Sequence, residues 1–171
     1  MPSAEEIIRQ LNLKPLPGEG GFYRETYRSA EKIPREALPG RYGTEKSFST
    51  AIYYLLTPGA SSAFHRLPAD EIFHFYLGDP VLMLKLHPDG RAEEIILGQE
   101  IDKGQFVQTI VPANTWQGCL LREGGSFALL GTTVAPGFDF SDYETGDRET
   151  LLEKYPEYWK IIIKLTNFIH S

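Results

Sequence analysis

Residues 59–78 read GASSAFHRLPADEIFHFYLG, and the side chains best suited to chemistry are concentrated in this stretch. Two of the four histidines, His65 and His74, lie on either side of the carboxylate Glu71. The segment DEIFHFYLG is rich in aromatic residues and is bounded by glycine, which predicts a β-strand. We therefore expect any functional site to be built around this stretch.

The rest of residues 48–136 predicts an all-β core. Short apolar runs recur as FSTAIYYLLT, DEIFHFYLG, VLMLKLH, AEEIILG, FVQTIVP, WQGCLL and SFALLGTTVAP. They are separated by turn signals such as TPGAS, GDP, HPDG and DKGQ. This spacing is typical of an antiparallel sandwich or barrel and not of alternating βαβ units.

The flanking segments complete one domain that spans residues 1–171. Residues 1–47 predict a short helix over residues 3–13, with Ser3 and Glu6 as a capping box, then an edge strand and a long surface loop over residues 32–46. Residues 137–171 predict a lid or helical segment, with helical apolar spacing over residues 148–155 and 157–168. We expect PGFDF, residues 136–140, to pack in the fold or at a subunit interface, with a lid over the barrel as the alternative.

Composition narrows the class of protein. A net charge of −6 argues against nucleic-acid binding, which needs clustered Lys and Arg. No run of about twenty apolar residues is present, and the N-terminus MPSAEEIIRQ is acidic, so we expect a cytoplasmic protein without a membrane span. The one cysteine, Cys119, lies in an apolar run and is expected to be a buried, inert thiol.

The central stretch also has the spacing of a known motif. Gly59, His65, Glu71 and Gly78 fit the first cupin motif, Gly-x5-His-x-His-x3-4-Glu-x6-Gly, with Leu67 in place of the second histidine. The second cupin motif returns as GQFVQTIVPANTWQ, residues 104–117, in which a glutamine ends the motif in place of its histidine.

Over nearly its full length the chain resembles the uncharacterised cupin-5 family, also called domain of unknown function 985. The resemblance rests on GEGGFYRETYRS, STAIYYLLTPGASSAFHRLPADEIFHFYLGDP, VPANTWQG and TVAPGFDFSDYE. PLPGEGG stands in place of the family's usual His-Pro-Glu-Gly-Gly. The resemblance implies a jelly-roll barrel (double-stranded β-helix), usually a homodimer, with a pocket inside the barrel. It implies no particular reaction.

A catalytic metal is disfavoured by two departures from the motif. Leu67 and Gln117 occupy two of the four ligand positions, and a neutral glutamine is a poor substitute for imidazole on a divalent transition metal. His65 and Glu71 alone do not make a tight site. We therefore expect no metal and no other cofactor.

Strand alternation predicts the composition of a metal-poor pocket. Glu71, Phe73, Phe75 and Leu77 share one face of their strand. From the second motif, Gln117 faces inward together with Cys119 and Leu121. His65, Glu71 and Gln117 would then converge beside Phe73 and Phe75, and one of Tyr53 and Tyr54 would join them, with Tyr54 our choice as a ligand contact. Such a pocket favours a small polar metabolite, such as a sugar or nucleotide derivative.

Two other functions remain open at this point. A metal-independent isomerase or epimerase of a keto-sugar would use His65 and Glu71 as an acid–base pair. A non-catalytic dimeric module would use the barrel only as structure. His74 points away from Glu71 in a regular strand, towards a sheet or dimer interface, and would become a ligand contact only if a β-bulge reversed the alternation.

Overall fold

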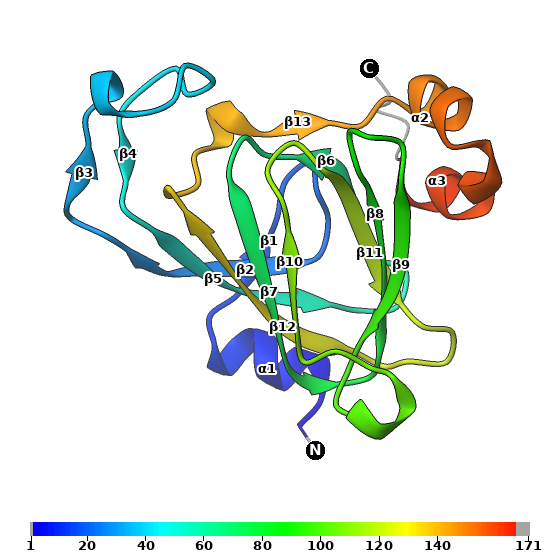
Figure 1. Cartoon of the computed structure of the whole chain (residues 1–171). Helices are drawn as coiled ribbons and strands as arrows, with labels where there is room; N and C mark the ends of the chain where they lie inside the picture. The colour runs from blue at the N-terminus through cyan, green and yellow to red at the C-terminus, as the bar shows by residue number, and fades with distance from the viewer. Residues whose placement is uncertain (1, 167–171) are drawn as a thin grey trace.

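The computed structural model describes residues 2–166 and consists mainly of antiparallel strands (Figure 1). The strands are β1 (Lys14–Pro15), β2 (Phe22–Arg28), β3 (Lys32–Ile33), β4 (Lys46–Ser47), β5 (Thr50–Leu56), β6 (Ser61–Arg66), β7 (Asp70–Gly78), β8 (Val81–Leu86), β9 (Ala92–Leu97), β10 (Gln108–Val111), β11 (Trp116–Leu121), β12 (Ala128–Ala135) and β13 (Glu144–Thr145). The helices are α1 (Ala4–Gln10), α2 (Arg148–Lys154) and α3 (Trp159–Leu165), with short 3-10 turns η1 (Arg35–Ala37), η2 (Ile101–Lys103), η3 (Phe140–Asp142) and η4 (Pro156–Tyr158).

Two sheets form the barrel. One sheet has six strands in the order β1-β2-β5-β12-β7-β10, and the other has five in the order β13-β6-β11-β8-β9. Neighbouring strands in both sheets run antiparallel. The jelly-roll barrel expected from the sequence is thus confirmed.

The barrel is filled by side chains from both sheets. Phe73, Phe75 and Leu130 of the six-stranded sheet pack with Met83 and Cys119 of the five-stranded sheet, and all five are buried. Full burial of a large apolar side chain stabilises the fold by about 1.5–3 kcal/mol. This cluster therefore holds the two sheets together and confirms that Cys119 is a buried thiol.

Helices cover the outer faces of the sheets. The N-terminal helix α1 packs over the six-stranded sheet through Ile7, next to Leu55 and Leu129. Its predicted capping box is present, since Ser3 Oγ accepts a hydrogen bond from the Glu6 amide and Glu6 Oε2 accepts one from the Ser3 amide. At the other end of the chain, α2 and α3 pack on the outside of the five-stranded sheet, at the upper right of Figure 1.

Several predicted segments differ from the structure. Strand β6 was not among the predicted strands, yet it carries His65. The loop at residues 32–46 is not wholly a surface loop, because Leu38 and Tyr42 are buried against Leu67 and Val134. The last helix ends at Leu165, and the remainder of its predicted range, 167–168, lies outside the described residues.

A register shift in β7 limits the alternation. Opposite β12, Phe75 pairs with Leu130 and Leu77 pairs with Leu129, so one extra residue of β7 lies between them. Leu77 therefore packs in the outer cluster beneath α1, and its predicted inward position is wrong. The shift comes after His74, so Glu71, Phe73 and Phe75 keep the inward face.

Within residues 2–166, no helix combines the length and the apolar character needed to span a membrane.

Candidate functional site

A cavity of about 410 Å³ lies inside the barrel. Its buried lining includes Tyr54 from β5, His65 from β6, Glu71 from β7 and Thr132 from β12. Its exposed lining residues, which we call the rim, are Asn12, Lys14, Arg24, Glu25, Arg28 and Phe140. The volume is in the range of small-molecule sites, about 300–1,000 Å³.

His65 is held by hydrogen bonds at both ring nitrogens. Nδ1 lies 2.7 Å from the carbonyl oxygen of Ala63 and donates to it. This contact leaves Nε2 of the neutral ring as an acceptor, and the Gln117 Nε2 amide donates to it at 2.9 Å. Gln117 lies opposite His65 in the pairing of β11 with β6, which explains why the two side chains meet.

The same amide also holds Glu71. Gln117 Nε2 donates to Glu71 Oε2 at 3.0 Å, so one amide nitrogen bridges the histidine and the carboxylate. The structure thus brings together His65, Glu71 and Gln117, the three polar residues that the sequence predicted to converge inside the barrel. Gln117 Oε1 is buried and has no hydrogen-bond partner in the described part of the chain.

Glu71 titrates close to neutral pH. Burial raises the pKa of its carboxyl to about 7, with the nearby His65 opposing the rise and Glu19 adding to it. A carboxyl group with such a pKa is present in both protonation states near pH 7, which suits a general acid or base.

Two side chains next to His65 were not predicted from the sequence. Glu19 Oε1 accepts a hydrogen bond from Ser62 Oγ at 2.7 Å and lies 4.0 Å from His65 Nε2. The ring of Tyr143 stacks on the ring of His65, with centroids 4.7 Å apart and planes 19° apart. Glu19 lies in the glycine-rich GEGG turn, a pattern from which a role in the site could have been predicted. No local pattern links Tyr143 to His65.

The turn that carries Glu19 depends on its glycines. Gly20 has φ +102°, and a Cβ atom at this position would lie 2.2 Å from the carbonyl oxygen of Ser61. The missing side chain lets the turn press against β6, where the amide of Ala63 donates to the carbonyl oxygen of Glu19 at 2.9 Å.

The tyrosine alternative is resolved by the position of the two rings. Tyr54 lines the cavity, and its hydroxyl donates to the carbonyl oxygen of Gly20 at 2.9 Å. Burial raises the pKa of Tyr54 well above its usual value, so the phenol keeps its proton. Tyr53 faces the other side of β5, where it packs beneath α1 and Arg24 lies over its ring.

The structure does not bring four of the expected ligand contacts to the cavity lining. One of them, Gln117, is held by its hydrogen bonds to His65 and Glu71. Phe73 and Phe75 lie in the packed core of the barrel instead. His74 lies on the outer face of β7, where Nε2 is 3.1 Å from Thr133 Oγ1 and Nδ1 is 3.2 Å from Gln108 Nε2. The side chains of β7 alternate regularly up to Phe75, which explains why His74 lies on the outer face.

The donor set does not fit a divalent metal ion. His65 Nε2 and Glu71 Oε2 both accept hydrogen bonds from the Gln117 amide. The motif position of the second histidine is occupied by the buried side chain of Leu67. Among residues 2–166, no group of three or more His, Cys, Asp or Glu side chains could hold a metal ion.

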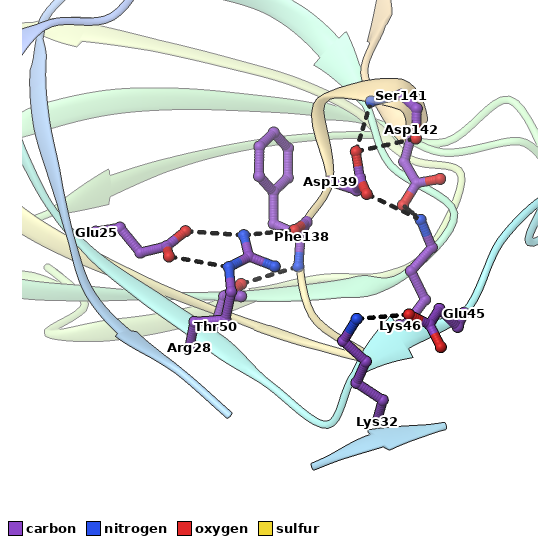
Figure 2. Close-up of polar contacts among 10 residues, drawn as sticks. All are labelled: Glu25, Arg28, Lys32, Glu45, Lys46, Thr50, Phe138, Asp139, Ser141 and Asp142. Carbon is purple, nitrogen blue, oxygen red and sulfur yellow. Dashed lines mark hydrogen bonds and ion pairs between the residues drawn. The ribbon is translucent and has the colours of Figure 1, made fainter. Parts of the chain in front are cut away.

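A segment that we call the strap, residues 137–142, lies beside the rim (Figure 2). Phe138 and Phe140 of the strap line the cavity. The Phe138 amide donates to Thr50 Oγ1 at 2.9 Å, and its carbonyl oxygen accepts from Arg28 at 3.0 Å. Arg28 also forms two hydrogen bonds with Glu25, at 2.8 and 2.9 Å. The strap thus contributes two aromatic side chains to the cavity lining.

Comparison with known proteins places this architecture among uncharacterised relatives. A family model described as Cupin superfamily (DUF985) matches residues 5–146, a range that includes every residue lining the cavity. The uncharacterized protein YML079W of Saccharomyces cerevisiae is 29% identical over 133 residues, which are 73% of this chain and 66% of that protein. The chain thus spans just under two thirds of the length of this curated relative.

Solved structures are similar to this chain over nearly its full length. Protein SO0799 from Shewanella oneidensis is 34% identical with a TM-score of 0.85, over 98% of this chain and 99% of that chain. A hypothetical protein from Leishmania major is 31% identical with a TM-score of 0.83, over 96% and 99%. Oxalate decarboxylase from Bacillus subtilis has a TM-score of 0.54 at 15% identity, over 91% of this chain and 37% of that one, a likeness of fold alone.

Proposed function

Since the chain belongs to the DUF985 family of the cupin superfamily, we propose that it binds a small polar metabolite inside the barrel. The observation that carries this proposal is the cavity of about 410 Å³ with His65, Glu71 and Tyr54 in its buried lining. Buried polar groups that converge on a cavity of this size are typical of small-molecule sites.

The rim supports a sugar or nucleotide derivative as the ligand. Lys14 brings positive charge to the exposed part of the lining, while Arg28 is paired with Glu25. Tyr23 and Phe138 add aromatic surface. An anionic group at the rim and a hydroxyl-rich group at the buried end would match this distribution.

Ligand binding can be tested without knowing the metabolite. Native mass spectrometry of the purified protein should reveal a retained small molecule, and thermal shift with sugar phosphates and nucleotide sugars should identify a stabilising class. A ligand whose free concentration is about 100 times its dissociation constant stabilises the folded state by about 2.7 kcal/mol.

Two variants make this test specific. His65→Asn should abolish the stabilisation by the ligand, whereas Glu94→Gln, at an exposed position on β9, should preserve it. Equal stabilisation of His65→Asn and the wild type would contradict binding in this cavity.

A second function, isomerisation of a keto-sugar, is favoured by the pKa of Glu71 near 7 beside His65. One of these two groups would remove the proton from the carbon next to the carbonyl, and the other would return a proton to the opposite face. Incorporation of deuterium from D₂O into a keto-sugar would support this reaction, and full turnover by His65→Ala would exclude it.

Three further expectations belong to the same proposal: the protein acts without a bound metal, as a homodimer, and in the cytoplasm. Elemental analysis, light scattering of the purified protein and localisation in its own cell test them one by one. The third interpretation, a barrel that serves only as structure, predicts an occluded interior, and the cavity counts against it.

A further inference from the structure

The strap continues into the strand next to His65. After Asp142 the chain passes through Tyr143 into β13, where Thr145 pairs with His65. The Gly146 amide then donates to the carbonyl oxygen of Phe64 at 2.8 Å. A displacement of the strap would therefore be transmitted directly to the backbone beside His65.

Tyr143 supplies the only contact among the described residues that covers a face of the His65 ring by stacking. The ring edge is already held at Nδ1 by Ala63 and at Nε2 by Gln117. The hydroxyl of Tyr143 is buried without a hydrogen-bond partner in the described part of the chain. Its position is thus determined by the stacked ring and by the backbone, and not by its polar end.

The strap is fixed by a buried ion pair, shown in Figure 2. Lys46 Nζ lies 2.6 Å from Asp142 Oδ2 and 4.0 Å from Asp139 Oδ2, and the Lys46 side chain is only 1% exposed. The contact is an ion pair without hydrogen-bond geometry, since Lys46 Nζ has no hydrogen-bond partner in the described part of the chain. A buried ammonium group is costly unless it is paired, so loss of Asp142 would leave an uncompensated charge beneath the strap. Asp142 directly precedes Tyr143.

We propose that the Lys46–Asp142 pair is a clasp that fixes the strap beside the rim and thereby places Tyr143 on His65. Lys46, Asp142 and Tyr143 are then positioning residues of the site, and the environment of His65 is complete only when the strap is closed. This role of the clasp holds in the ligand-free protein and does not depend on which metabolite the cavity binds.

The chain offers a matched control. Lys32 bonds Glu45 at 2.5 Å, close to Lys46, but both side chains of this pair are 55% exposed (Figure 2). An exposed pair contributes little to stability. Lys32→Met therefore removes a similar charge from the same hairpin without opening the clasp.

The first experiment observes His65 directly, because a stacked aromatic ring shifts the proton resonances of the imidazole. In the ¹H–¹³C spectrum of the full chain, with His65→Asn used for assignment, Lys46→Met and Asp142→Asn should move the His65 resonances downfield, and Lys32→Met should leave them unchanged. Tyr143→Phe should keep the wild-type position, and Tyr143→Leu should lose it.

The second experiment measures opening of the strap by amide hydrogen exchange. Exchange at Gly137 and Phe138 should be at least about tenfold faster in Asp142→Asn, whereas the amides of β7 should exchange as in the wild type. If an unpaired charge prevents folding, the double variant Lys46→Met/Asp142→Asn removes both charges and gives the same test. Wild-type His65 resonances and wild-type strap exchange in this double variant would overturn the clasp.

Discussion

Gln117 Nε2 lies 3.0 Å from Glu71 Oε2, so the amide that takes the place of a cupin-motif histidine holds the carboxylate. The same nitrogen donates to His65, which leaves Gln117 Oε1 without a partner among the described residues. Because one nitrogen serves both partners, a rotation that turned Oε1 towards Glu71 would also take the N–H donors away from His65. The observed orientation of the amide therefore keeps both Glu71 and His65 as acceptors.

Replacement of Glu71 by glutamine should change how stability depends on pH. The carboxyl has a pKa of about 7 in the folded protein and 4.5 as its ordinary value, so the folded state binds the proton more tightly. Stability should therefore fall as pH rises from 4.5 to 7, and the full cost of up to roughly 3 kcal/mol should be present above pH 7. In Glu71→Gln this cost is absent.

Urea unfolding at pH 5 and pH 8 measures the effect. The wild type should lose more stability than Glu71→Gln between the two values, while Glu36→Gln, at an exposed position, should follow the wild type. Parallel losses in all three proteins would show that Glu71 is ionised normally.

Removal of the charge on Glu19 should lower the pKa of Glu71. Glu19 raises that pKa through like-charge repulsion, so Glu19→Gln should let Glu71 ionise at a lower pH, by about half a unit to one unit. Titration of the Glu71 side-chain carbon resonance by NMR gives the value. Glu25→Gln is the matched control, since Glu25 also lines the cavity but lies at the rim; an equal effect of both variants would assign the shift to net charge alone.

Restoration of the two missing motif histidines should create a metal site. Leu67→His/Gln117→His adds imidazoles to His65 and Glu71, and four such donors suit Zn²⁺. We expect about one equivalent of Zn²⁺ per chain in the double variant by elemental analysis and no tight binding in the wild type. A stoichiometric metal in the wild type as purified would contradict our interpretation of Leu67 and Gln117.

Two glycines of the same turn should differ in their tolerance of alanine. Gly18 and Gly20 both have positive φ, but a Cβ atom at Gly18 meets no atom within 4 Å, whereas at Gly20 it would lie 2.2 Å from a backbone oxygen. Gly18→Ala should cost about 1 kcal/mol of unfolding free energy, and Gly20→Ala about 3 kcal/mol or more. Denaturant unfolding measures both, and equal costs would mean that the turn does not press on β6.

Much of the barrel was predictable from local patterns. Alternation placed Glu71, Phe73 and Phe75 inward because β7 keeps a period of two until the register shift, and it failed at Leu77, beyond that shift. Strand β6 was missed because its middle residues, 62–65, are all buried, which removes the alternation.

The site itself was only partly predictable. His65, Glu71 and Gln117 were found because the motif spacing fixes their places, and His65 and Gln117 lie opposite each other on neighbouring strands. Tyr143 meets His65 only through the pairing of β13 with β6, a contact between distant parts of the chain that no local pattern encodes.

The single thiol of the protein can also report how often the barrel opens. Cys119 is the one cysteine of the chain and lies fully buried inside the barrel, where burial, Glu19 and Glu71 together raise its pKa. A thiol reagent added to the folded protein can react only when the barrel admits it, so the alkylation rate counts openings of the interior. A ligand that fills the cavity should lower the alkylation rate of Cys119, whatever the chemical identity of that ligand.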